Sequence, residues 1–162
     1  MMQESIDIIR GSRSFLIKLI EGISIQKLNE VPTGFHNNII WNIAHAIATQ
    51  QSLCYVNSDL EPLVGKDFIE KYKSGTKPEG FVSEDDFQKI RDFLISTIDQ
   101  FEKDAYSDTF NSYHTFDLKS YPGVRIGSVK DAIKFAVFHE GLHLGYIMAL
   151  KKVVNNENAG QA

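Results

Sequence analysis

The sequence predicts an all-α fold, a four-helix bundle with long connecting loops. Four segments repeat apolar residues at steps of three and four, which is the period of a helix with one buried face. Proline disrupts helix interiors, and all four prolines fall between these segments: Pro32, Pro62, Pro78 and Pro122. With 162 residues, 43% of them apolar, the chain suits one domain with a substantial core.

The first predicted helix spans about Gln3 to Glu21, and Gly22 supplies a C-terminal stop. Its expected apolar stripe consists of Ile8, Ile9, Phe15, Leu16, Leu19 and Ile20. The second predicted helix runs from about Asn38 to Asn57, and Asn37 or Asn38 can serve as its N-cap. Its apolar side is formed by Ile39, Ile40, Ile43, Ile47 and Cys54.

The third predicted helix opens with Ser83-Glu84-Asp85-Asp86, a sequence close to a capping box, and continues through Phe101. The fourth opens with Ser128-Val129-Lys130-Asp131 and runs to about Val154. We therefore expect one domain over residues 1–154 and a disordered polar tail over residues 155–162.

The connections 58–82 and 105–127 are long for a plain up-and-down bundle, which favours crossovers or a lid over one end. Aromatic residues of the second connection could cover a pocket.

Composition argues against several classes of function. The formal charge is −4, and the 17 Lys and Arg are dispersed among 21 Asp and Glu, so we expect no nucleic-acid partner. The single cysteine, Cys54, has no partner for an internal disulfide. The N-terminal residues lack the apolar run of a secretory signal, and no segment reaches the length of a membrane span. These features predict a soluble, cytoplasmic protein without a membrane partner.

Two histidines on the fourth predicted helix suggest a metal site. His139 and His143 are four residues apart, so both rings project from one helical face and can reach a single cation. They share an arc of the helix with apolar residues: Val129, Ala132, Ala136, Ile147, Leu150 and Val154. The alternative is a pair of hydrogen-bonded core histidines, but it requires separate buried partners for two adjacent polar rings. We therefore favour metal ligation.

A metal site open to substrate usually has three protein ligands. Of the remaining histidines, His36 precedes the second predicted helix, His114 lies in a loop, and His45 lies in mid-helix, where a rigid scaffold can position it. His45 is therefore the best candidate. It shares a mixed face with Trp41, Asn42, Thr49 and Ser52, which is typical of a pocket lining, but periodicity leaves simple surface exposure equally open.

Two motifs add a resemblance that covers nearly the whole chain. Trp41-Asn42-Ile43-Ala44-His45, followed about ninety residues later by His139-Glu140-Gly141-Leu142-His143-Leu144-Gly145, resembles the DinB-like superfamily. The resemblance implies a four-helix bundle, often dimeric, that binds a divalent metal, commonly nickel or zinc, through a histidine triad. Here it implies His45, His139 and His143 as ligands, and a homodimer.

The resemblance also implies an activity. It favours a metal-dependent transferase that uses a low-molecular-weight thiol such as bacillithiol or mycothiol, and relatives include a thiol-dependent isomerase. We name Trp41, Asn42, Thr49 and Tyr146 as pocket candidates because they share helical faces with the ligands, although packing and capping are their simpler roles. Two alternatives stay open: a metal-dependent hydrolase, and a non-catalytic metal- or ligand-binding module.

Residues 139–143 also match the metalloprotease pattern H-E-x-x-H, in which the glutamate is a general base. A protease would need a further ligand downstream, and the sequence after His143 offers only Glu157 in the polar tail. Proteolysis is therefore disfavoured. Glu140 could orient a ligand, act as a catalytic base, or bond to another helix. The small-x3-small spacing of Gly141 and Gly145 permits close helix approach, either between two chains or within one bundle.

Overall fold

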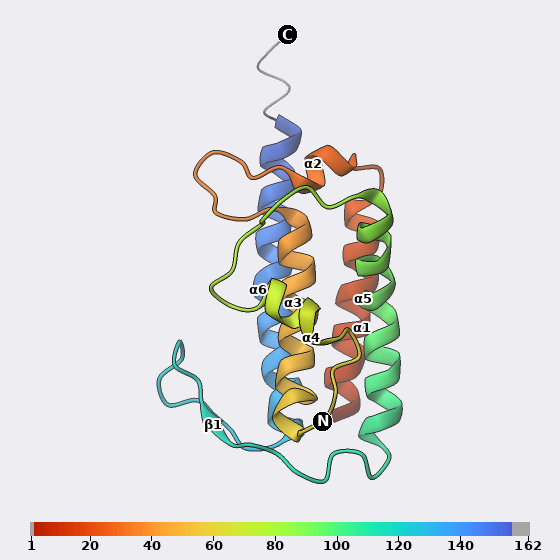
Figure 1. Ribbon diagram of the computed structural model, residues 1–162, viewed down its shortest axis with the longest axis vertical. Helices are drawn as coiled ribbons and strands as arrows, with labels where there is room; N and C mark the ends of the chain where they lie inside the picture. The colour runs from red at the N-terminus through yellow and green to blue at the C-terminus, as the bar shows by residue number, and fades with distance from the viewer. Residues whose placement is uncertain (1, 157–162) are drawn as a thin grey trace.

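The computed structural model describes residues 2–156, and it confirms the all-α prediction. The four predicted helices are α1 (Met2–Ile20), α3 (Ile39–Cys54), α5 (Glu84–Ala105) and α6 (Val129–Asn156). They form an elongated bundle in which α1 and α6 run in one direction and α3 and α5 in the other (Figure 1). Helix α6 packs against both α1 and α3, and α5 packs against the same two helices.

The direction of the helices explains the long connection between α3 and α5. Because these two helices run the same way, the chain must return along the length of the bundle between them (Figure 1). The crossover prediction is therefore confirmed. The returning segment follows the 3-10 helix η1 (Val56–Ser58) and contains α4 (Lys66–Tyr72), a short helix that packs on α3. Neither α4 nor the short α2 (Ile25–Asn29) was predicted.

The N-terminal ends of α3 and α5 follow from side-chain caps that the sequence indicates. Asn38 Oδ1 accepts a hydrogen bond from the backbone N–H of Trp41 at 2.8 Å, and Ser83 Oγ accepts from that of Asp86 at 3.2 Å. Each cap satisfies a backbone donor of the first helical turn that has no partner within the helix. The same argument holds for α6, where Ser128 Oγ accepts from the Asp131 N–H at 3.2 Å.

The buried stripe of α1 differs from the predicted one. Ile8 and Phe15 are 55% and 47% exposed, so the prediction was wrong for both. The residues that are buried recur at steps of three and four: Ile6, Ile9, Arg13, Leu16 and Ile20. Two overlapping apolar patterns exist on this helix, and the buried one includes a charged residue, Arg13, whose partner lies on α6. The prediction was correct for Ile9, Leu16 and Ile20, but the pattern of apolar residues alone also included two exposed positions.

Helix α3 is buried on more sides than expected. Both the apolar side and most of the mixed face that contains His45 are inaccessible to solvent. The reason is α4, which covers this helix from outside the four-helix ring.

The ends of the chain and the second long connection also differ in detail from the predictions. Helix α6 continues to Asn156, so the predicted disorder was wrong for Asn155 and Asn156, and residues 157–162 lie outside the described residues. The connection before α6 holds a small antiparallel hairpin, β1 (Phe116–Asp117) paired with β2 (Arg125–Ile126). Within residues 2–156, no helix has both the length and the apolar character needed to cross a bilayer.

Candidate metal centre

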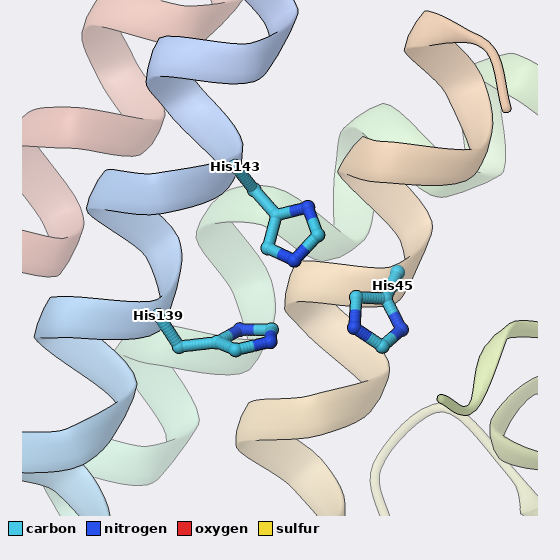
Figure 2. Close-up of side chains that lie close together, drawn as sticks. All are labelled: His45, His139 and His143. Atoms are coloured by element: carbon cyan, nitrogen blue, oxygen red, sulfur yellow. The ribbon is translucent and has the colours of Figure 1, made fainter. Parts of the chain in front are cut away.

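Three histidines meet between α3 and α6. His45 comes from the middle of α3, and His139 and His143 come from successive turns of α6 (Figure 2). The ring centroids are 4.5 Å apart for His139 and His143, and 5.1 and 4.8 Å from these two rings to His45. One ring nitrogen from each residue lies within 4.8 Å of the other two, and Figure 2 shows these nitrogens directed toward a common centre. The structure thus brings together all three predicted ligands.

The spacing is close to what a single cation requires. Histidine nitrogens bind zinc at about 2.0–2.1 Å, so two ligands of one ion lie at most about 4.2 Å apart. The observed limit of 4.8 Å is wider, so the three nitrogens must move closer together to bind one ion. The triad can therefore hold a metal ion.

His45 is held on one face of its ring and at its edge. Its Nδ1–H donates to the backbone carbonyl of Tyr72 at 2.6 Å, which leaves the lone pair on Nε2. The indole of Trp41 stacks on the ring at 4.6 Å between centroids and an interplanar angle of 8°. The Thr49 hydroxyl lies 3.4 Å from Nε2. These contacts fix the orientation of His45, which is only 5% exposed.

The two histidines of α6 differ in their surroundings. His143 Nδ1 lies 2.8 Å from the side-chain Oδ1 of Asn42 on α3, so this ring also has a partner that orients it. His139 Nδ1 is buried and has no hydrogen-bond partner among the described residues. An unpaired polar atom in a buried position is costly, but Figure 2 shows the other ring nitrogen of His139, Nε2, directed toward the common centre. The case for a cation therefore rests on the three nitrogens that face one another, and not on this unpaired atom.

The environment keeps the imidazoles neutral, as metal ligation requires. Burial lowers the pKa of His139 to about 3, and the neighbouring charges of His143 and His45 act in the same direction. Burial likewise lowers the pKa of His143 to about 4, with a contribution from His45. Burial also lowers the pKa of His45, although its hydrogen bond to Tyr72 opposes the shift. All three rings therefore offer lone pairs at neutral pH.

Comparison with known proteins agrees with this geometry. A family model described as the DinB superfamily matches residues 8–147, which is most of the chain. The chain belongs to the DinB superfamily. No curated protein matches it. The resemblance drawn from the tryptophan–histidine motif and the histidine pair is thus confirmed.

In this DinB-superfamily chain, the glutamate of the H-E-x-x-H pattern points away from the triad. Glu140 is buried and accepts hydrogen bonds from Arg13 of α1, from Nε to both carboxylate oxygens at 3.1 Å and from Nη2 at 2.5 Å. Arg13 Nη1 also donates to the Leu94 carbonyl at 3.0 Å and to Thr97 Oγ1 at 2.8 Å, both on α5. Of the three roles expected for Glu140, the bond to another helix is confirmed.

The remaining histidines lie elsewhere. His36 is exposed, and His114 Nε2 lies 2.8 Å from both carboxylate oxygens of Asp59 at the surface. Among the pocket candidates of this DinB-superfamily site, Trp41, Asn42 and Thr49 contact the triad as described above. Tyr146 is 37% exposed and packs edge-on against Phe35 at 5.6 Å. A role in substrate binding stays a prediction for all four.

Two residues that shape the site were missed by the sequence reasoning. Tyr72 contributes only a backbone carbonyl, which no side-chain pattern can reveal. Arg13 was detectable, because it continues the three-and-four spacing of Ile6, Ile9 and Leu16 on α1. A charged residue within such a stripe indicates a buried partner, and here the partner is Glu140.

Proposed function

We propose that this DinB-superfamily protein is a metal-dependent enzyme, a transferase that uses a low-molecular-weight thiol. One observation carries the proposal: three neutral imidazoles from two helices direct their free nitrogens toward one centre. Three protein ligands are typical of catalytic metal sites, because they leave coordination positions for water or substrate. His139 and His143 are half-buried, which supports access from solvent.

A divalent ion at this centre would lower the pKa of a coordinated thiol and act as a Lewis acid toward a substrate oxygen. The protein's own contribution is positioning. Trp41 and the Tyr72 carbonyl hold the His45 ring from two directions, and Asn42 holds His143. We propose nickel or zinc as the ion, since imidazole ligation suits both.

The arrangement of Glu140 argues against a hydrolase of the H-E-x-x-H type. A hydrolase of the H-E-x-x-H type needs its glutamate free to take a proton from bound water. Glu140 instead directs both carboxylate oxygens to Arg13, inside the bundle. A thiol requires no such base at the metal, because coordination itself promotes loss of its proton. The assignment to a thiol, as opposed to another nucleophile, rests on the family resemblance.

We also propose that two chains associate through α6. Gly141 and Gly145 are exposed, and a Cβ atom at either position would meet nothing within 4 Å, so neither glycine serves packing inside this bundle. Phe138, Leu142 and Tyr146 are 48%, 48% and 37% exposed on the same helix. Apolar side chains beside small residues suit contact with another helix, and we propose a second copy of this chain as the partner.

The proposal is tested by assaying protein loaded with nickel or zinc against electrophilic substrates, with and without added thiol. We expect turnover only when both metal and thiol are present, and loss of turnover in His45→Ala. Turnover that is unchanged when thiol is omitted would refute the transferase assignment and favour hydrolysis.

A further inference from the structure

The side-chain amide of Asn42 is fixed by contacts on α3 itself. Its Nδ2 donates to the Asn38 carbonyl at 2.7 Å and to Asn37 Oδ1 at 2.8 Å. Both partners accept hydrogen bonds, so the amide nitrogen must occupy that side and Oδ1 must occupy the other. Asn38 is also the N-cap of α3, so Asn42 is anchored to the capped first turn of a rigid helix.

This orientation decides which nitrogen of His143 carries hydrogen. Asn42 Oδ1 lies 2.8 Å from His143 Nδ1, and an amide oxygen can only accept a hydrogen bond. His143 must therefore carry its hydrogen on Nδ1, which leaves the lone pair on Nε2. The carbonyl of Tyr72 imposes the same state on His45 from the other side of the site, at 2.6 Å.

We propose that Asn42 is a positioning residue of the metal site, which holds His143 in the tautomer and ring orientation needed for ligation. This inference rests on the proposed metal centre. Asn42 is only 1% exposed, and its amide hydrogens are both directed to residues just before α3, so we infer that it acts on the site through His143.

The consequence of losing Asn42 Oδ1 follows from the two tautomers of a neutral imidazole. Without an acceptor at Nδ1, the hydrogen can move to Nε2, where it blocks the ligating lone pair, and the ring is free to rotate about its side-chain bonds. Removing a hydrogen-bond partner of a metal-ligating histidine typically lowers metal affinity about 10- to 100-fold. We expect a loss of this size for Asn42→Leu.

The variants test the acceptor oxygen of Asn42 separately from the volume of its side chain. Asn42→Leu removes the acceptor at similar volume, while the Asn38 carbonyl keeps its bond from the backbone N–H of residue 42 at 3.2 Å. Gln50→Leu is the matched control, because Gln50 is a fully buried amide on the same helix whose oxygen accepts from Gln51 at 2.9 Å.

Two measurements test the inference. Zinc affinity is measured by competition with a chromophoric chelator, and the tautomer of each histidine is read from long-range ¹H–¹⁵N NMR spectra of the metal-free protein. We expect wild-type His143 to carry hydrogen on Nδ1. We expect zinc affinity to fall about 10- to 100-fold in Asn42→Leu and to stay near wild type in Gln50→Leu.

The inference is overturned if wild-type His143 carries hydrogen on Nε2, a result that does not depend on how any variant folds. It is also overturned if wild type binds zinc and Asn42→Leu binds it equally well, or if Gln50→Leu loses as much affinity. Failure of the proposed metal centre is distinguishable: wild type itself would then show no zinc binding, whatever the tautomer.

Discussion

Arg13 of α1 and Glu140 of α6 form an ion pair inside the bundle, with side chains only 1% and 7% exposed. Glu140 directly follows His139 in sequence. The ion pair with Arg13 therefore fixes how α6 is rotated about its own axis at the turns that carry His139 and His143. The same guanidinium also binds Leu94 and Thr97 on α5, and three of the four bundle helices thus meet at one side chain. Burial raises the pKa of the Glu140 carboxyl, and the charge of Arg13 opposes the rise.

Breaking this pair from one side should strongly destabilise the protein. Arg13→Met leaves a buried carboxylate without its partner, and we expect the free energy of unfolding to fall by about 3–5 kcal/mol. The double variant Arg13→Met/Glu140→Leu removes both charges and should recover most of the loss. Urea unfolding of the metal-free protein measures both values.

The control for this prediction is Arg125→Met, which breaks the exposed pair of Arg125 with Asp117 and should change stability little. A double variant as unstable as Arg13→Met would show that the loss comes from packing and not from the unpaired carboxylate.

The stability of the metal-free protein should decrease as the pH falls below about 6.5, the ordinary histidine pKa. Burial lowers the pKa of His139 to about 3 and that of His143 to about 4 in the folded state. Between these values and about 6.5, the unfolded chain binds protons that the folded chain does not, so protonation favours unfolding. Above about pH 7.5 both states are neutral at these rings and their contribution is constant.

Urea midpoints of the metal-free protein at pH 8 and pH 5.5 test this prediction. We expect the double variant His139→Leu/His143→Leu to lose less stability over this interval than wild type. An equal loss in both proteins would assign the pH dependence to other groups.

The dimer prediction depends on the exposed apolar residues of α6. Leu142→Glu places a charge among Phe138, Tyr146 and the two exposed glycines, and burying an unpaired charge in an interface is costly. We expect light scattering at micromolar concentration to give the mass of two chains for wild type and of one chain for Leu142→Glu. Lys103→Glu, an exposed change on α5 and away from this face of α6, should remain dimeric. A monomeric wild type would refute the proposal.

The sequence predicted most of the helical architecture, because long segments with a buried face carry a strong periodic signal. Caps such as Ser83 and Asn38 also located helix starts well, since they act through local hydrogen bonds. His139 and His143 could be paired from spacing alone, because both lie on one helix. His45 could not be assigned to them from periodicity, since its distance from α6 depends on how two helices pack.

The parts that sequence reasoning missed depend on tertiary contacts. Helix α4 has only seven residues, too few for a periodic signal, yet it buries the face of α3 around His45 and supplies the Tyr72 carbonyl. On α1, the predicted apolar stripe included Ile8 and Phe15, and the bundle leaves these two side chains exposed. The buried alternative includes Arg13, whose burial is possible only because Glu140 of a distant helix neutralises it.

The metal content of protein purified without an affinity tag tests the central claim most directly. Elemental analysis should give close to one nickel or zinc ion per chain for wild type, and strongly reduced content for His45→Ala and His143→Ala. His114→Ala, which removes a histidine outside the triad, should retain the wild-type content. Metal content that is unchanged in both triad variants would contradict ligation by these residues.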